Sequence, residues 1–440
     1  MAKRRPWAAL GTDTSGVVGI LFALALPILV GFTGLGIEVG LWYLDRRETQ
    51  MAADAAAVSA AFEALRQSDE STITTAARQE AARHGVNAAI GVFEVNHPPL
   101  SGPNTDNIDA VEVRISQPRN LLLARLFLGD SIDISARAVA IPNPSGTACV
   151  LSLDANAAGA VTVSGNGTID MPGCVVAANS NDDQAIELTG SGTLKTQTLS
   201  TPGGFNQIGG SSTLSTTEAL RTRVQPLANP YADLNAPAVG ACEHNSYAAG
   251  GGGGHGGGGG GGSSTPVSLS PGTYCNGMSF GSQAQVDFAP GTYVVAGGQF
   301  QVSAGATLAC GGCTSGDGVT FILTSNGTGY AQVRINGNAS IDLRAPNHGS
   351  YAGLLFFQDP AAPTGGTNYF NGNATMKLHG ALYFPHQSVD FSGNSSIAGA
   401  ACTQIVAATV VFSGASTMGS NCTDSGVTEI NAGGTVNLVE

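Results

Sequence analysis

The chain has 440 residues and a formal net charge of −13, with only 11% charged side chains and 62 glycines. Its length exceeds that of one ordinary core, so two or three domains are expected. The small-residue composition suits tight turns and closely stacked strands. The acidic balance argues against nucleic acid as a partner, because phosphate binding needs a basic surface.

An uncharged apolar segment, Val17–Ile37, follows a basic start at residues 3–5. At about 1.5 Å rise per helical residue, this segment is long enough to cross a hydrocarbon core of about 30 Å. A cleaved signal peptide, whose apolar core usually has about 7–15 residues, and a buried core helix are the alternatives. We expect a retained transmembrane helix over residues 16–40, with a basic cytoplasmic N-terminus at 1–15.

Two residues of the apolar segment have both a structural and a functional interpretation. Pro27 lies in mid-span, where a proline kinks a helix or is simply tolerated. Glu38 lies at the outer edge, where a carboxylate either rests at the interface or contacts a helix of a partner protein.

Beyond the span, the pattern predicts a helical neck with a small α/β collar over residues 41–145. Alanine favours helix, and alternation of apolar and polar residues indicates strand. The expected elements are helices over Met51–Leu65 and Thr72–Asn87, a strand over Ala110–Ile115, a short helix over Pro118–Leu128 and a strand over Ile132–Ile141. A Pro/Gly-containing stretch at 142–146 then marks a domain boundary.

The segment Gly16–Ala61 resembles the N-terminal module of TadE/TadG-like Flp pilus-assembly proteins. The matching phrases are Ala23-Leu24-Ala25-Leu26-Pro27, Gly36-Ile37-Glu38-Val39-Gly40, Tyr43-Leu44, Arg46-Arg47 and Gln50-Met51-Ala52-Ala53-Asp54-Ala55-Ala56-Ala57. The acid after the span is often Asp in such proteins, so Glu38 departs mildly from the pattern. A pilin itself is not expected, because no acid lies five residues after Gly16.

The resemblance implies a component of the tight-adherence (Tad) pilus machinery in the bacterial inner membrane. Its partners would be other Tad pilus-assembly membrane proteins. The residues that the resemblance assigns to the motif and to partner contact are Pro27, Glu38, Gln50, Ala53 and Asp54.

From residue 146 to 440 a short phrase recurs, in which a polar residue and Gly precede small residues, Thr or Ser, and an aliphatic residue. Successive copies are separated by 25 and 20 residues early on and by 21 and 21 residues late. This period predicts an all-β domain, a β-solenoid of the right-handed β-helix type, with a β-sandwich as the alternative. The aliphatic residues expected to face inward include Val161, Ile169, Ile341 and Val389.

The repeat region also resembles the β-solenoid ectodomain of some TadG-like proteins, through phrases such as Pro271-Gly272-Thr273-Tyr274-Cys275 and Ala381-Leu382-Tyr383-Phe384-Pro385. Residues 250–262, all glycine except His255, predict a flexible insertion that splits the repeats.

All eight cysteines follow the apolar segment, and an even count in a small-residue domain suggests disulfides in an oxidising compartment. They are Cys149, Cys174, Cys242, Cys275, Cys310, Cys313, Cys402 and Cys422. Sequence neighbours form the natural pairs, although the connectivity stays open. Together with the basic N-terminus, the cysteines place the C-terminal domain in the periplasm, from where it could reach the cell surface.

The search for catalytic, cofactor-binding and metal-binding residues yields none. Cys310-Gly311-Gly312-Cys313 lacks a second cysteine pair for zinc and a thioredoxin-like surrounding, so a loop disulfide is favoured. Asp182-Asp183 is interpreted as a solvated turn.

We therefore expect a non-enzymatic pilus-assembly or adhesion subunit, with surface glycans or host or abiotic surfaces as further candidate ligands. The alternatives are a β-helix enzyme acting on envelope polysaccharide and an adhesin unrelated to pili.

Overall fold

The computed structural model describes residues 15–66, 68–125, 129–144, 146–209, 211–250, 266–314, 316–371, 375–393, 402–414, 416–417, 422 and 424–440. The glycine-rich insertion and nearly all of the basic N-terminus therefore lie outside the described residues. The chain divides into two units: unit 1 comprises Met1–Asn143 and Gly434–Glu440, and unit 2 comprises Pro144–Gly433. Unit 2 is thus an insertion into unit 1, and the expected domain at 146–440 loses its last seven residues to unit 1.

Unit 1 contains one very long helix and one short helix. Helix α1 (Ser15–Leu65) has 51 residues and includes Pro27 without interruption. Its N-terminal part is apolar and exposed, and it is the one described helix long and apolar enough to cross a membrane. Helix α2 (Glu70–Arg83) is preceded by Asp69, whose side chain caps the helix by accepting a hydrogen bond from the backbone N–H of Thr72.

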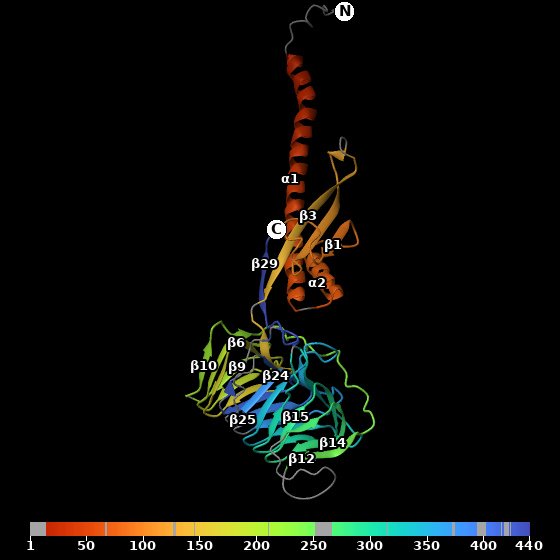
Figure 1. Ribbon diagram of the computed structural model, residues 1–440. Helices are drawn as coiled ribbons and strands as arrows, with labels where there is room; N and C mark the ends of the chain where they lie inside the picture. The colour runs from red at the N-terminus through yellow and green to blue at the C-terminus, as the bar shows by residue number, and fades with distance from the viewer. Residues whose placement is uncertain are drawn as a thin grey trace, which may run out of the picture. The chain divides into compact units, whose positions relative to one another are not determined.

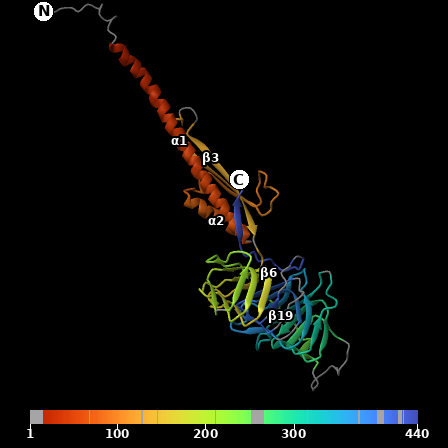
Figure 2. The ribbon, with the colours of Figure 1, turned by 90° about the vertical axis from the view of Figure 1, so that its left-hand side faces the viewer.

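A four-stranded sheet completes unit 1, in the order β1-β2-β3-β29. Its strands are β1 (Val92–Asn96), β2 (Val111–Asn120), β3 (Ser131–Pro144) and β29 (Gly434–Leu438). Both β1–β2 and β2–β3 are antiparallel. Figure 2 shows β3 running along α1, with α2 and β29 beside them.

The short helix expected over Pro118–Leu128 is wrong in its first part, because residues 118–120 belong to β2. Strand β1 begins at Val92, opposite Ser116, so Pro118 has a neighbouring strand, β3, on one side only. Proline lacks a backbone donor and is tolerated at such a free edge. Residues 126–128 lie outside the described part.

The core of unit 1 is built on the alanine-rich part of α1. Six alanines of α1 are fully buried, and α2 and the inner face of the sheet pack against them. The alanines are Ala52, Ala53, Ala56, Ala57, Ala60 and Ala61. Their spacing of one, three and four residues places them on one face of the helix, where small side chains let neighbouring elements approach closely.

Unit 2 is one large sheet of 25 described strands, whose strand pairings are parallel where their register is given. The first strands are β4 (Ala148–Ser152), β5 (Val161–Ser164), β6 (Thr168–Ala178), β7 (Ile186–Thr189), β8 (Thr193–Thr201), β9 (Phe205–Ile208), β10 (Thr213–Thr216), β11 (Arg221–Thr222) and β12 (His244–Ala249). The next are β13 (Val267–Leu269), β14 (Gly272–Phe280), β15 (Gln285–Phe288), β16 (Gly291–Ala296), β17 (Gln299–Val302), β18 (Thr307–Ala309), β19 (Val319–Thr324), β20 (Gln332–Ile335) and β21 (Ser340–Arg344). The last are β22 (Leu354–Gln358), β23 (Thr367–Asn371), β24 (Thr375–Phe384), β25 (Ser388–Gly393), β26 (Thr403–Ala407), β27 (Val410–Gly414) and β28 (Ser416–Thr417).

The order of the strands in space differs from their order in the chain. Strand β4 lies between β26 and β6, so the chain enters unit 2 in the interior of the sheet. The early strands proceed to one end at β9, β10 and β11, whereas β12 and β13 form the other end and the later strands return to β4. Figure 1 shows this order, with blue β24 and β25 between yellow-green β10 and green β14.

The interior of unit 2 is lined by the aliphatic residues of the repeats and by stacked aromatic rings. Val161, Ile169, Ile341 and Val389 are all buried, as their positions in the repeats predicted. Successive strands add rings to a continuous series in which neighbouring centroids lie 4.8–6.3 Å apart; it includes Phe300, Phe321, Phe356, Phe370, Phe384, Phe391 and Phe412. The parallel pairing differs from the antiparallel sheets of a β-sandwich.

Candidate functional site

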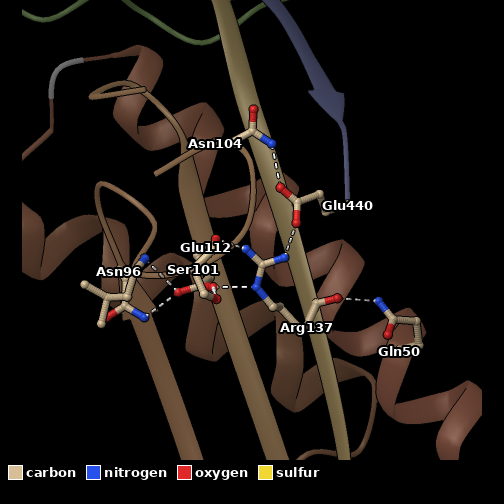
Figure 3. Close-up of polar contacts among 8 residues, drawn as sticks. Gln50, Asn96, Ser101, Asn104, Glu112, Arg137 and Glu440 are labelled. Carbon is tan, nitrogen blue, oxygen red and sulfur yellow. Dashed lines mark hydrogen bonds and ion pairs between the residues drawn. The ribbon is translucent and has the colours of Figure 1, made fainter. Parts of the chain in front are cut away.

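Two of the residues that sequence analysis assigned to the motif, Gln50 and Asp54, lie at the junction between α1 and β3 of unit 1. Gln50 projects from α1, and its side-chain amide donates to the backbone carbonyl of Arg137 at 2.8 Å and to a carboxylate oxygen of Asp54 at 2.7 Å. Gln50 therefore ties the family motif of α1 to the central part of β3 (Figure 3).

Arg137 is the centre of a polar network that was not predicted from the sequence. Its Nε donates to Glu112 at 2.5 Å, and its terminal nitrogens donate to Glu440 and to the backbone carbonyl of Ser101. Glu440, the last residue of the chain, also accepts from the amide of Asn104 at 2.6 Å. The network joins β2 and β3 to Glu440, which follows β29, and to the loop that contains Ser101 and Asn104 (Figure 3).

Glu112 is the buried acid of this network, and its side chain has no solvent exposure. It also accepts hydrogen bonds from Asn96, from the backbone N–H of Leu100 and from the hydroxyl of Ser101. A buried carboxylate needs such partners, because an unpaired charge costs several kcal/mol to desolvate.

The network changes the acidity of its three members. Burial alone would raise the pKa of Glu112, but the bonds from Arg137 and the neighbouring donors hold that pKa below its ordinary value. The bond from Arg137 likewise lowers the pKa of Glu440. Burial opposes the charged form of Arg137, yet the two carboxylates raise its pKa. All three groups are therefore charged at neutral pH.

A surface groove of about 510 Å³ lies where α1 meets the sheet, and Gln50 and Arg137 form part of its wall. Arg46 of α1 and Arg114 of β2 line the same groove, and neither makes an ion pair among the residues that the structure describes. Glu94 lies opposite Arg114 in the register of β1 and β2. Arg46 is therefore the least neutralised charge of the groove.

Glu38 makes intramolecular contacts that neither interpretation of the sequence included. Its carboxylate accepts the backbone N–H groups of Leu122, Leu123 and Ala124 at 2.6, 2.8 and 2.8 Å. These residues follow β2 in the β2–β3 hairpin, and this described part of the connection is called the hairpin tip below. Only 3% of Glu38 is exposed. Any contact of Glu38 with a partner helix would have to compete with these three bonds.

The other residues assigned to the motif differ in how accessible they are to a partner protein. Ala53 is fully buried in the core of unit 1, and Asp54 accepts the bond from Gln50. Pro27 lies within α1 in a stretch of exposed residues. Partner contact through these residues stays a prediction, with Ala53 the least accessible of them.

The eight cysteines form four disulfides, all within unit 2, between the neighbours in sequence that were expected. The pairs are Cys149–Cys174, Cys242–Cys275, Cys310–Cys313 and Cys402–Cys422. The CxxC segment is thus a disulfide-closed loop.

The acids considered for catalysis are engaged locally. Asp183 pairs with Arg223 at 2.6 Å, and Asp182 accepts the backbone N–H of Gln184 at 2.8 Å. Within the described ranges, no group of three or more His, Cys, Asp or Glu side chains is placed to hold a metal ion.

Two family profiles match this part of the chain. Residues 16–64 match the TadE/G-like Flp pilus-assembly family, and residues 43–140 match the Tad-like Flp pilus-assembly family. The two matches overlap on α1 and together span α1, α2 and the strands β1, β2 and most of β3. No curated protein and no solved structure matched the chain.

The fold therefore defines an α/β module built on one long helix, with a large β insertion. This N-terminal module is similar to the TadE/G-like and Tad-like families of Flp pilus-assembly proteins.

Proposed function

We propose that the chain is a membrane-anchored, non-enzymatic component of Flp pilus assembly. The observation that carries the proposal is the continuity of α1. Its exposed apolar part and its family-specific, alanine-rich part form one helix, so the module matched by the family is attached directly to the anchor. Anchor and module then act as one rigid element.

In this proposal the N-terminus is cytoplasmic and everything after the span is periplasmic. Three basic residues precede the apolar segment, in agreement with the positive-inside rule. The four disulfides support an oxidising compartment for unit 2.

Unit 2 is proposed to be a β-solenoid, in which each coil of the repeat adds a layer. Parallel pairing between strands two or three positions apart supports this assignment. Its role would be that of a rigid, disulfide-stabilised ectodomain for assembly or adhesion. The local engagement of Asp182 and Asp183 gives no support to a polysaccharide-cleaving enzyme.

The groove of unit 1 is the proposed docking site for another pilus-assembly component. Arg46 belongs to the family motif, is exposed and makes no ion pair among the described residues, so an acidic segment of the partner is the complementary ligand.

Deletion of the gene tests the proposal, because a strain lacking the chain should form no Flp pili. Normal piliation in the deletion strain would refute the assembly role. The groove is tested separately by Arg46→Glu, which should reduce piliation while the protein remains in the membrane at normal abundance. Arg47→Glu is the matched control, since Arg47 is exposed on the same helix but does not line the groove.

A further inference from the structure

We propose that the tip of the β2–β3 hairpin enters the lipid interface beside α1, so that unit 1 contacts the bilayer at two points. The inference rests on the proposed membrane anchoring of α1. The occupant of the exposed tip would be phospholipid of the leaflet on the unit 1 side.

The hairpin tip is fixed to α1 at the end of the apolar run. Besides the three bonds to Glu38, Leu123 packs against Gly34, one turn earlier in the helix. A Cβ atom at Gly34 would lie 2.1 Å from Cδ1 of Leu123, so the close approach requires glycine or a displaced Leu123. The tip therefore lies at the level of residues 34–38.

Residues 34–38 lie closer to the apolar run than the aromatic residues that are expected to mark the boundary between lipid and water. Trp42 and Tyr43 follow Glu38, and 68% of Tyr43 is exposed. Aromatic residues of this kind concentrate at the boundary between lipid and water. Tyr43 lies five positions after Glu38 in the helix, which is about 7.5 Å along the axis. A bilayer that spans the apolar run up to Ile37 thus reaches the hairpin tip.

The role of Glu38 follows from the same placement. Backbone N–H groups of an irregular segment find water at a protein surface, but in a bilayer they must be satisfied by the protein. The carboxylate of Glu38 satisfies three consecutive N–H groups of the tip. Such a partner is what a loop needs if lipid surrounds it, and it accounts for a buried acid at the end of an otherwise uncharged span.

The side chains of the tip match a lipid interface. Leu122 is 67% exposed and Leu123 41% exposed, next to the exposed apolar surface of α1. Arg125 follows them, is exposed and makes no ion pair among the described residues. Apolar side chains that enter the acyl region beside an arginine that reaches phosphate are typical of interfacial segments.

The test measures the depth of spin labels on the full-length chain in nanodiscs of phosphatidylethanolamine and phosphatidylglycerol. All described cysteines are paired, so an introduced cysteine is the one free thiol. The variants are Leu122→Cys at the tip, Ile37→Cys on α1 at the same level, and Gln79→Cys on the exposed face of α2.

The ratio of oxygen to nickel-complex accessibility should be similar at 122 and 37 and several-fold higher at both than at 79. If 122 resembles 79 while 37 remains lipid-exposed, the hairpin proposal fails and the anchor stands. If 37 also resembles 79, the anchor itself fails. Low accessibility of 122 to both reagents would mean that protein covers the tip, which also overturns the proposal.

Discussion

Replacing Arg137 by methionine should loosen the edge of the unit 1 sheet by about 3 kcal/mol. The variant keeps much of the side-chain length but leaves Glu112, whose side chain is fully buried, without its cation. Breaking a buried pair costs about 3–5 kcal/mol. Arg137 is 25% exposed, so the lower end of that range applies.

An independent bound gives a similar number. Without Arg137, Glu112 can avoid a buried charge by binding a proton. Protonating a carboxyl of ordinary pKa, about 4.3, at pH 7 costs about 3.7 kcal/mol, which limits the part of the loss that comes from the unpaired charge of Glu112. The hydrogen bonds of Arg137 to Glu440 and to the carbonyl of Ser101 are lost as well, but those groups are partly solvated.

Hydrogen–deuterium exchange of the full-length protein measures this loss where it occurs. About 3 kcal/mol corresponds to roughly a 100-fold rise in the opening constant, expected for the amides of β29 and of the loop around Ser101. Arg114→Met is the control, because Arg114 lies opposite Arg137 in the register, is exposed and makes no ion pair among the described residues. Equal exchange in the two variants would refute the proposed role of Arg137, which is to hold β29 and the loop around Ser101 to the rest of the sheet.

Three further predictions concern acid, the hairpin tip and a disulfide. Because the folded pKa of Glu112 lies below its ordinary value, its stabilisation is present above the ordinary carboxyl pKa and is lost as pH falls through the folded value; acid should therefore raise the opening constant of β29, obtained after correction for the slower intrinsic exchange in acid, more in the wild type than in Arg137→Met. Glu38→Gln should speed exchange of the hairpin-tip amides without affecting unit 2, since a neutral amide has one acceptor oxygen in place of two; unchanged tip exchange would contradict the role assigned to Glu38. Removing the Cys242–Cys275 disulfide by a double serine substitution should cost about 4 kcal/mol, visible as a lower midpoint of thermal unfolding, and an unchanged midpoint would show that the strand pairing alone holds this end of unit 2.

The sequence predicted the features that depend on local pattern. The long apolar run and the alanine-rich segment predicted α1, and the positions of the repeats predicted that Val161 and Val389 face inward. Cys149 and Cys174 lie on neighbouring strands because β4 and β6 pair, so proximity in the sequence became proximity in space.

The features that depend on long-range pairing could not be predicted from the sequence. The ending Gly434–Leu438 has the same small and β-branched character as the repeats, so nothing local distinguishes a strand of unit 1 from one of unit 2. The interaction between Arg137 and Glu112 could not be predicted either, because in the sequence each is an ordinary polar residue of an alternating strand. The role of Arg137 becomes apparent only in the structure, where Glu440 lies at the edge of the sheet and accepts a hydrogen bond from Arg137.

The placement of unit 2 between β3 and β29 links its folding to that of unit 1. A disordered loop of the length of residues 144–433 would cost about 5 kcal/mol in closure entropy before β29 could pair. Unit 2 removes this cost, because its own ends are joined: Ala432 donates to the carbonyl of Gly146 at 3.2 Å, and Ala148 donates to that of Ile430 at 2.8 Å. Because the ends of the folded insertion are joined, β29 begins close to the end of β3. The Arg137 network then has to stabilise only the pairing of β29 with the sheet. Unit 1 can thus accommodate a large insertion without loss of its fourth strand.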